Sequence, residues 1–569
     1  MNSVPSDLLA LQRLYYWEKT SPDRIALTQP MGGGVVQNFT WAQVGDQVRR
    51  MATHLQSQGW EPGAKVAILS KNCAWWLMSD LAIWMAGYVS VPLYPTLAHD
   101  TVKQILVHSE ARACFIGKLD DWGTMKPGVP TDMPCISYAL SPADAVKRFE
   151  GWDAIIARNV ALRGDPVRPA DELATLIYTS GTTGQPKGVM HSFGNLAWAI
   201  ATGVKSVGMM REDRMLSYLP LAHVVERVLV EHGWLATGMH VFFAESLETF
   251  TSDLQRARPT IFFSVPRLWV KFQHGVHHKL PPAKLDRLLS IPIVGGLVRR
   301  KVKKALGLDQ CRFAAGGAAP MPVSLLAWYR KLGLPINEGY GLTENLAVSH
   351  LTLAGQNQEG SVGPTYPGVD ARIDPDTGEI QMRSPALMLG YYKAPELTRE
   401  AFTPDGWLRT GDKGQIDAQG KLRITGRVKD LFKTSKGKYV APAPIEDKLV
   451  MHDAVEACVV TGANLGQPLG IVMLNAEALG RTTEPSARAE IETSLGQHLQ
   501  TINDTLDPHE QLKCLVVVTT AWTVENDLVT PTFKVKRNRI EDAYSANYER
   551  WESSGQRVIW QSASQEGVS

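Results

Sequence analysis

A polyphosphate site needs flexible glycines, hydroxyl donors and a cation, and residues 178–192 combine them in YTSGTTGQPKGVMHS. The three glycines permit backbone shapes that turn N–H groups toward an anion, and Lys187 supplies the charge. A Walker P-loop has glycine directly before its lysine and Ser or Thr directly after it, whereas Pro186 and Gly188 flank Lys187 here. The stretch therefore predicts a phosphate-binding loop of another type, with a flexible surface turn as the alternative.

Four further motifs with clustered glycine, acidic and basic residues follow this loop. They are NEGYGLTE (residues 337–344), WLRTGD (407–412), GRVKDLFKTSKGKYVAP (426–442) and TPTFKVKR (530–537). With the loop, and in this order, they resemble the adenylate-forming superfamily of acyl-CoA synthetases, luciferases and peptide-synthetase adenylation domains. Three more segments are similar to its long-chain fatty acyl-CoA synthetase branch: LPLAHVVER (219–227), RPTIFFSVPRLW (258–269) and KGKYVAPAPIE (436–446).

The resemblance implies an enzyme that works in two steps. A carboxylate attacks the α-phosphate of ATP and forms acyl-AMP with release of pyrophosphate, and a thiol then displaces AMP. The implied cofactors are ATP, Mg²⁺ and coenzyme A, and the implied substrate is a medium- or long-chain fatty acid. Two alternatives stay open: transfer of the acyl group to carrier-protein phosphopantetheine, and activation of a short-chain or aryl carboxylate.

The resemblance also implies roles for single residues in these motifs. The loop would wrap the β- and γ-phosphates, the Tyr340 ring would stack on adenine, and Glu344 would hold Mg²⁺, a hard ion that prefers oxygen ligands. From local sequence alone, Glu344 is equally an acid at a helix N-terminus. The residues expected to bind ATP or AMP are Thr179, Ser180, Gly181, Thr182, Thr183, Gly184, Lys187, Gly316, Gly317, Ala318, Glu338, Gly339, Tyr340, Gly341, Thr343, Asp412, Arg427 and Lys534.

The residues expected to take part in catalysis are Lys534, Thr343, Glu344 and His223. Lys534 would bridge the carboxylate and the α-phosphate. Lys536 points to the same side of an extended segment, so the choice between the two lysines stays open. His223 follows a strand pattern, where a histidine is often structural. The next turn contains Glu226 and Arg227, whose opposite charges suggest an ion pair.

The elements that position these residues follow from periodicity. Apolar strands alternate with amphipathic helices through most of the chain, which predicts an α/β protein with stacked, largely parallel and mixed sheets over residues 1–426. Residues 73–86 predict a buried helix and residues 88–94 a buried strand, rather than a membrane span. A hairpin at 414–426 precedes a small α+β lid over residues 427–569. The resemblance places the lid hinge at Lys429 and a pantetheine tunnel at Gly437.

Composition restricts the partners. A net charge of +2, from 59 basic and 57 acidic residues, gives no overall attraction to nucleic acid. The six cysteines are scattered without metal-binding spacing, and residues 1–24 show no signal-peptide pattern, so we expect a cytoplasmic enzyme with free thiols. The basic run RRKVKK at 299–304 follows apolar residues, which suggests peripheral contact with the inner face of a membrane or, alternatively, a solvated helix face. A homodimer is left open.

Overall fold

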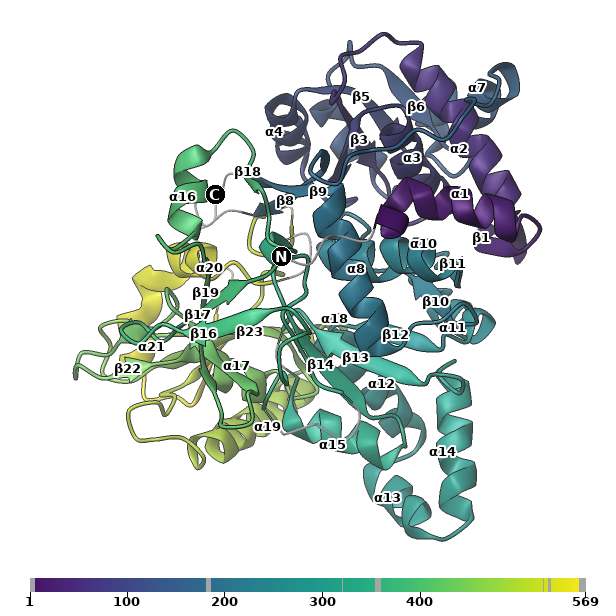
Figure 1. The fold of residues 1–569 in the computed structure, drawn as a ribbon. Helices are drawn as coiled ribbons and strands as arrows, with labels where there is room; N and C mark the ends of the chain where they lie inside the picture. Colours follow the sequence, from purple (N-terminus) through teal and green to yellow (C-terminus); the bar gives the residue numbers. More distant parts are fainter. Residues whose placement is uncertain are drawn as a thin grey trace. The chain divides into compact units, whose positions relative to one another are not determined.

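The computed structural model describes residues 6–180, 186–319, 321–353, 360–524, 526–530 and 534–561. The chain divides into two compact units (Figure 1). The first consists of Met1–Ala319, Leu326–Ala371 and Met382–Arg409, and the second of Pro320–Leu325, Arg372–Gln381 and Thr410–Ser569. The expected domain boundary at residue 427 stays a prediction.

The first unit contains a large sheet with the strand order β18-β9-β8-β4-β3-β5-β6-β7. The strands from β4 to β7 run parallel, whereas β8 and β9 form an antiparallel hairpin and β18 pairs antiparallel with β9. Their bounds are β3 (Lys65–Leu69), β4 (Val89–Leu93), β5 (Ala111–Ile116), β6 (Cys135–Ser137), β7 (Glu150–Gly151), β8 (Leu173–Ser180), β9 (Pro186–Ser192) and β18 (Gly390–Tyr391).

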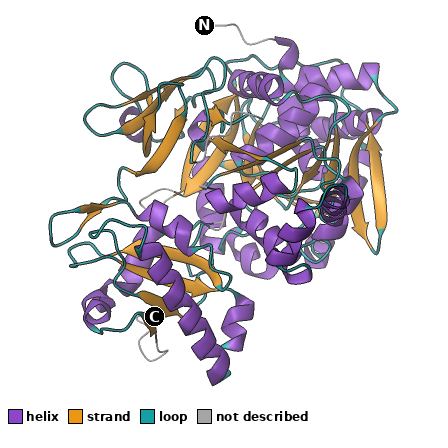
Figure 2. Cartoon of the chain, turned by 90° about the horizontal axis from the view of Figure 1, so that it is seen from below, coloured by secondary structure: helices purple, strands orange, loops and turns teal. Residues whose placement is uncertain are grey.

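Two four-stranded sheets complete the first unit, in the orders β10-β11-β1-β2 and β12-β13-β14-β15. The bounds are β1 (Ile25–Gly32), β2 (Val35–Thr40), β10 (Arg214–Ser217), β11 (His240–Phe243), β12 (Ile261–Ser264), β13 (Phe313–Gly317), β14 (Ile336–Tyr340) and β15 (His350–Leu351). Each combines parallel and antiparallel pairs, and Figure 2 shows helices packed against the sheets. These mixed, stacked sheets confirm the α/β prediction.

Helix α3 (Ala74–Met85) shows why the apolar segment near residue 80 stays inside the protein. Every residue of α3 is buried, as expected of a helix that is apolar on all sides, and β4 follows after Gly87, whose φ of 95° permits the sharp turn. The predicted buried helix and strand are therefore confirmed. None of the helices in the described ranges has the length and hydropathy to cross a bilayer. All six cysteines are free thiols.

The second unit contains the predicted hairpin, in which β19 (Leu408–Ile416) pairs antiparallel with β20 (Leu422–Arg427), next to β16 (Asp370–Ile373) and β17 (Glu379–Arg383). A second sheet has the order β23-β24-β25-β26. The remaining bounds are β21 (Phe432–Lys433), β22 (Tyr439–Val440), α17 (Pro442–Leu449), β23 (Val455–Thr461), β24 (Leu469–Leu474), α19 (Pro485–Asn503), β25 (Leu515–Val518), α20 (Arg537–Tyr544) and β26 (Val558–Trp560). Helix α19 buries Ile491, Leu495, Leu499 and Ile502, whose spacing places them on one face of the helix.

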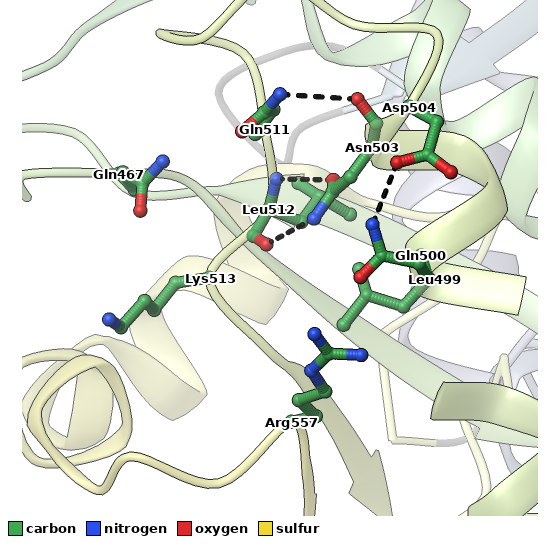
Figure 3. Close-up of a pocket in the computed structure, with 9 residues that line it drawn as sticks. All are labelled: Gln467, Leu499, Gln500, Asn503, Asp504, Gln511, Leu512, Lys513 and Arg557. Carbon is green, nitrogen blue, oxygen red and sulfur yellow. Dashed lines mark hydrogen bonds between the residues drawn. The ribbon is translucent and has the colours of Figure 1, made fainter. Parts of the chain in front are cut away.

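A polar depression of about 250 Å³ lies at the end of α19 (Figure 3). Its amides are largely occupied with one another: Asn503 exchanges hydrogen bonds with the Leu512 backbone, and Gln500 donates to Asp504 at 2.7 Å. None of the motif residues lines it.

Candidate active site

The predicted phosphate loop falls between β8 and β9, two strands that pair antiparallel. Thr179 lies opposite Lys187 in the ladder, so the two strands bring both ends of the loop together. Gly181, Thr182, Thr183 and Gly184, and the side chain of Ser180, lie outside the described residues. The prediction that Gly188 helps to surround an anion is corrected by the structure. This glycine has ordinary strand geometry and does not lie in a turn. A Cβ at Gly188 would lie 3.1 Å from the Tyr178 ring, which explains the glycine by packing.

Lys187 and Glu344 are joined through Tyr391, a residue that the sequence motifs did not indicate. The Tyr391 hydroxyl donates to Oε1 of Glu344 at 2.8 Å, and the Lys187 ammonium lies 5.4 Å from the centre of the Tyr391 ring. Burial and the Glu344 charge raise the pKa of Tyr391 above its ordinary value, so the hydroxyl stays protonated and donates. We call these three residues the Glu344 cluster. All three side chains are half-buried.

The backbone around Glu344 is held from two sides. The Met388 N–H donates to the Glu344 carbonyl at 2.8 Å, and Nε2 of buried His191 lies 2.8 Å from the Thr343 carbonyl. Because a carbonyl only accepts, Nε2 of His191 carries the proton. Burial lowers the pKa of His191 to about 4, aided by the Arg227 charge and opposed by the bond to Thr343, so the ring is neutral near pH 7. His191 lies inside the quoted loop motif, but only the fold reveals its contact.

Glycines among the residues expected to bind ATP or AMP lie on the adjacent parallel strands β13 and β14. Gly317 on β13 is opposite Gly339 on β14, and Gly316 is opposite Glu338. A Cβ at Gly317 would lie 2.7 Å from the Gly339 carbonyl oxygen, and one at Gly341 would lie 2.4 Å from the Ala347 backbone. The close approach of the backbone therefore requires glycine at positions 317 and 341.

Ala318 and Tyr340, which are also expected to bind ATP or AMP, have distinctive geometry too. Ala318 adopts a φ of 67°, a left-handed conformation that is uncommon for alanine. The Tyr340 ring is half-buried, 6.2 Å from the His350 ring. That these residues contact adenine stays a prediction.

His223 begins the short helix α9 (Val224–Glu226). Its Nδ1 accepts the Val225 N–H at 3.3 Å, which is the structural role that the sequence left open. A direct role of His223 in the reaction stays a prediction.

The suggested Glu226–Arg227 ion pair is wrong, because adjacent residues on a helix do not face each other. Glu226 Oε1 accepts from the Ser217 hydroxyl and the Tyr218 N–H, each at 2.9 Å, and from Asn72 at 3.2 Å. Burial raises the pKa of Glu226 to about 8, although the Ser217 and Tyr218 hydrogen bonds oppose the shift.

Arg227 instead pairs with Asp80 of α3 and with Glu231, whose Oε2 lies 3.2 Å from the Arg227 Nε, and all three side chains are fully buried. We call these residues the Arg227 cluster. Arg227 also donates to the Thr175 hydroxyl at 3.0 Å and lies over the rings of two tryptophans. Burial raises the pKa of Asp80 against the opposing Arg227 charge, and burial together with Asp80 raises that of Glu231.

In the second unit, Asp412 and Arg427 are cross-strand partners on β19 and β20. The Arg427 Nε lies 3.1 Å from the Asp412 Oδ1, with the Asp412 side chain 8% exposed and that of Arg427 55% exposed. The two residues expected to reach the ribose thus lie side by side, and the buried acid is oriented by the exposed arginine. Their contact with a nucleotide stays a prediction.

Lys534 and Lys536 differ in their surroundings. Lys536 forms an ion pair with Asp527, which also lies 2.8 Å from the Arg539 Nε. The side chain of Lys534 is exposed, and its backbone N–H donates to the Thr530 hydroxyl at 3.0 Å. Partial loss of solvent and the Arg427 charge lower the pKa of Lys534, while Asp412 raises it. Lys534, Asp412 and Arg427 therefore form one electrostatic group, and Lys536 belongs to another.

Lys429 and Gly437 lie in turns. Lys429 is exposed directly after β20. Gly437 has a φ of 76°, and its N–H donates to the Thr434 carbonyl at 2.9 Å in the turn between β21 and β22. The turn alone requires glycine here. The hinge and tunnel roles stay predictions.

The donors near Glu344 fit a Mg²⁺ ion that is shared with phosphates. Tyr391 occupies Oε1 of Glu344, and no described residue contacts Oε2. In the described ranges no group of three or more His, Cys, Asp or Glu side chains could form an all-protein metal site. One carboxylate with phosphate oxygens is the arrangement that Mg²⁺ commonly takes in nucleotide sites.

Comparison with known proteins identifies two family matches. The AMP-binding enzyme family matches residues 14–392, and the AMP-binding enzyme C-terminal domain matches residues 429–551. A long-chain-fatty-acid–CoA ligase, FadD15, of Mycobacterium bovis is 31% identical over 94% of this chain and 95% of its own. The peroxisomal long chain acyl-CoA synthetase 6 of Arabidopsis thaliana is 30% identical over 90% of this chain and 81% of its own.

Solved structures share the fold at lower identity. The A domain of carboxylic acid reductase from Segniliparus rugosus, with AMP and a co-purified carboxylic acid, has a TM-score of 0.78 at 23% identity, covering 97% of this chain and 94% of that one. The anthranilate CoA ligase AuaEII in complex with anthranoyl-AMP has a TM-score of 0.75 at 20% identity, covering 94% and 96%. These neighbours have the fold of adenylate-forming enzymes, and the present chain has it too.

Proposed function

Because this chain belongs to the AMP-binding enzyme family, we propose that it is an AMP-forming fatty acid–CoA ligase. It activates a medium- or long-chain carboxylate as acyl-AMP with release of pyrophosphate, and then transfers the acyl group to the thiol of coenzyme A. The acyl specificity is supported by relatives at about 30% identity that are named for long-chain fatty acids. The observation that carries the proposal is the Glu344 cluster, which places a cation and an unshared carboxylate oxygen beside the phosphate-loop strands.

The first step builds negative charge around phosphorus, so its catalysis is mainly electrostatic. Lys187 would bind the β- and γ-phosphates, the Thr343 hydroxyl would contact the α-phosphate, and Glu344 would hold Mg²⁺. The ion, when bound, would neutralise phosphate charge. His191 keeps the Thr343 backbone in place through its hydrogen bond to the carbonyl.

In the second unit, Lys534 is the better candidate for the catalytic lysine, because Lys536 is already paired with Asp527. Asp412 would accept hydrogen bonds from the ribose hydroxyls, and Arg427 would orient it. We further propose that residues 427–569 act as a mobile lid with its hinge at Lys429, and that Gly437 lines the path of pantetheine.

Peripheral membrane contact is a further part of the proposal, and the link between α13 (Pro282–Ser290) and α14 (Val294–Ala305) supports it. Ile293 is 85% exposed and has a φ of 67°. The Val294 N–H donates to the Pro292 carbonyl at 2.8 Å, so Ile293 is the centre of a strained γ-turn. Leu297 is 64% exposed, and Arg300 and Lys301 follow it on α14. Apolar tips with adjacent cations suit an anionic lipid surface. A cytoplasmic location and a homodimer also remain proposals.

Chromatography of nucleotide products tests the function. The protein is incubated with ATP, Mg²⁺, CoA and fatty acids of increasing chain length, either free or in anionic vesicles. AMP together with acyl-CoA, at certain chain lengths only, is the expected result. AMP without acyl-CoA would indicate a carrier protein as acceptor, and aryl acids test the alternative substrate class. Formation of ADP, or no turnover with any acid, would contradict the proposal.

A further inference from the structure

Tyr391 bridges two residues that lie far apart in the sequence. Lys187 is on β9, Glu344 is in the 3-10 turn Thr343–Asn345, and Tyr391 is on β18 at the edge of the large sheet (Figure 1). β18 pairs with β9 through Gly390–Met190 and Tyr391–Val189, which places the tyrosine beside the phosphate-loop hairpin. The sheet ladder therefore determines where the phenol lies.

The two contacts of Tyr391 use different parts of its side chain. The hydroxyl donates to Oε1 of Glu344 at 2.8 Å, and the ring face lies 5.4 Å from the Lys187 ammonium. A hydrogen bond to a carboxylate fixes its rotamer without neutralising its charge, and a ring face attracts a cation without occupying its donors. Both charged groups are thus oriented, while the second oxygen of Glu344 and the N–H donors of Lys187 stay available to a ligand.

We propose that Tyr391 is a positioning residue for nucleotide binding: its hydroxyl fixes Glu344 through Oε1, so that the second oxygen would be available to Mg²⁺, and its ring restrains the Lys187 ammonium, which would bind the phosphates. This inference rests on the proposed function and adds a residue to it. The neighbouring β18 backbone reinforces the arrangement, because the Tyr392 N–H donates to the Gly188 carbonyl at 2.8 Å and ties this segment to β9.

The adjacent tyrosine provides a matched control. The Tyr392 hydroxyl also donates to a carboxylate, Oε2 of Glu110 at 3.0 Å, but neither residue belongs to the Glu344 cluster. Tyr391→Phe removes the hydroxyl and keeps the ring, Tyr391→Leu removes both, and Tyr392→Phe removes an equivalent hydrogen bond one residue away.

Equilibrium binding of ATP, measured by calorimetry with Mg²⁺ and again in EDTA, separates the two contacts. Tyr391→Phe is expected to weaken binding about 10-fold with Mg²⁺ and less than about 2-fold in EDTA, since only the Glu344 contact is lost. Tyr391→Leu is expected to weaken binding in both conditions, and Tyr392→Phe in neither. In a Glu344→Gln background, Tyr391→Phe should have no further effect, which a purely structural role would not produce.

The outcomes distinguish this inference from the proposed function. If the wild type binds ATP more tightly with Mg²⁺ and Tyr391→Phe retains the full gain, the positioning role is overturned and the function stands. Equal losses for Tyr391→Phe in Mg²⁺ and in EDTA, or an equal loss for Tyr392→Phe, also overturn it. A wild type with no Mg²⁺-dependent gain would overturn both.

Discussion

The Glu344 cluster and the Arg227 cluster use similar side chains in opposite ways. Each contains one cation beside one or more aromatic rings and at least one carboxylate. The Glu344 cluster has a single half-buried acid with one unshared oxygen. The Arg227 cluster is fully buried, and its one arginine forms ion pairs with both acids. Both touch the same hairpin, since Thr175 of β8 contacts Arg227 and Lys187 lies on β9.

The difference shows that the number of charges in a cluster does not indicate a binding site. Burial raises the pKa values of Asp80 and Glu231, and both acids are paired with Arg227 out of contact with solvent, so the Arg227 cluster has no exposed charge to offer a ligand. Glu344 keeps its unshared oxygen because its partner is a neutral phenol. A charged group is available to a substrate when its neighbours orient it and do not neutralise it.

The largest effect is expected from Arg227→Met, which leaves buried carboxyls without their cation. The free energy of unfolding should fall by about 3–5 kcal/mol, measured by urea denaturation. Arg50→Met is the control, because Arg50 pairs with Asp46 at the surface and also donates to the Asn159 carbonyl, so its loss leaves no buried charge unpaired and should cost less. Replacing Asp80, Arg227 and Glu231 together by apolar residues should recover much of the loss. Glu344→Gln should change stability by less than about 0.5 kcal/mol. A stable Arg227→Met protein would remove the contrast between the two clusters.

The next effect concerns the same contrast in the second unit, between the exposed Lys534 and the paired Lys536. Lys534→Ala should lower acyl-AMP formation by about 10²–10³-fold, as for other preorganised transition-state contacts, and spare thioester formation from supplied acyl-AMP. Lys536→Ala should stay within about 3-fold of the wild type, because it loses only an ion pair near the surface. Pyrophosphate release measures both. The reverse ranking would assign the catalytic role to Lys536.

Per pH unit, the smallest expected change is the pH dependence of stability that comes from Glu226, another buried acid. Its pKa is raised from 4.5 to about 8 in the folded protein. The stability it contributes is therefore fully present below pH 4.5 and is lost as the pH rises through about 8. Relative to Glu226→Gln, the wild type should lose up to about 1.4 kcal/mol of unfolding free energy per pH unit in that window. Parallel pH profiles for the two proteins would mean that Glu226 is already ionised when buried.

Much of the fold could be predicted because its signals are local. The largely apolar run of α3, the alternation of strands and helices, and the turn of the β19–β20 hairpin depend on residues close together in the chain. The motif order likewise predicted the family, and it selected Lys187, Glu344, Asp412 and Lys534 as residues to follow.

Local sequence was enough to predict the helices and strands and the motifs that hold the chemical groups. The partners of those groups became visible only in the folded chain, because pairing between distant strands leaves no local pattern. Sheet order placed Tyr391 beside Glu344, 47 residues away, and His191 against Thr343, 152 residues away. Helix geometry turned Arg227 from its neighbour Glu226 toward Asp80, 147 residues away. Contacts of this kind form when the core packs. Glu344 and Arg227 therefore have opposite environments because of the packing of the sheet, and not because of either motif.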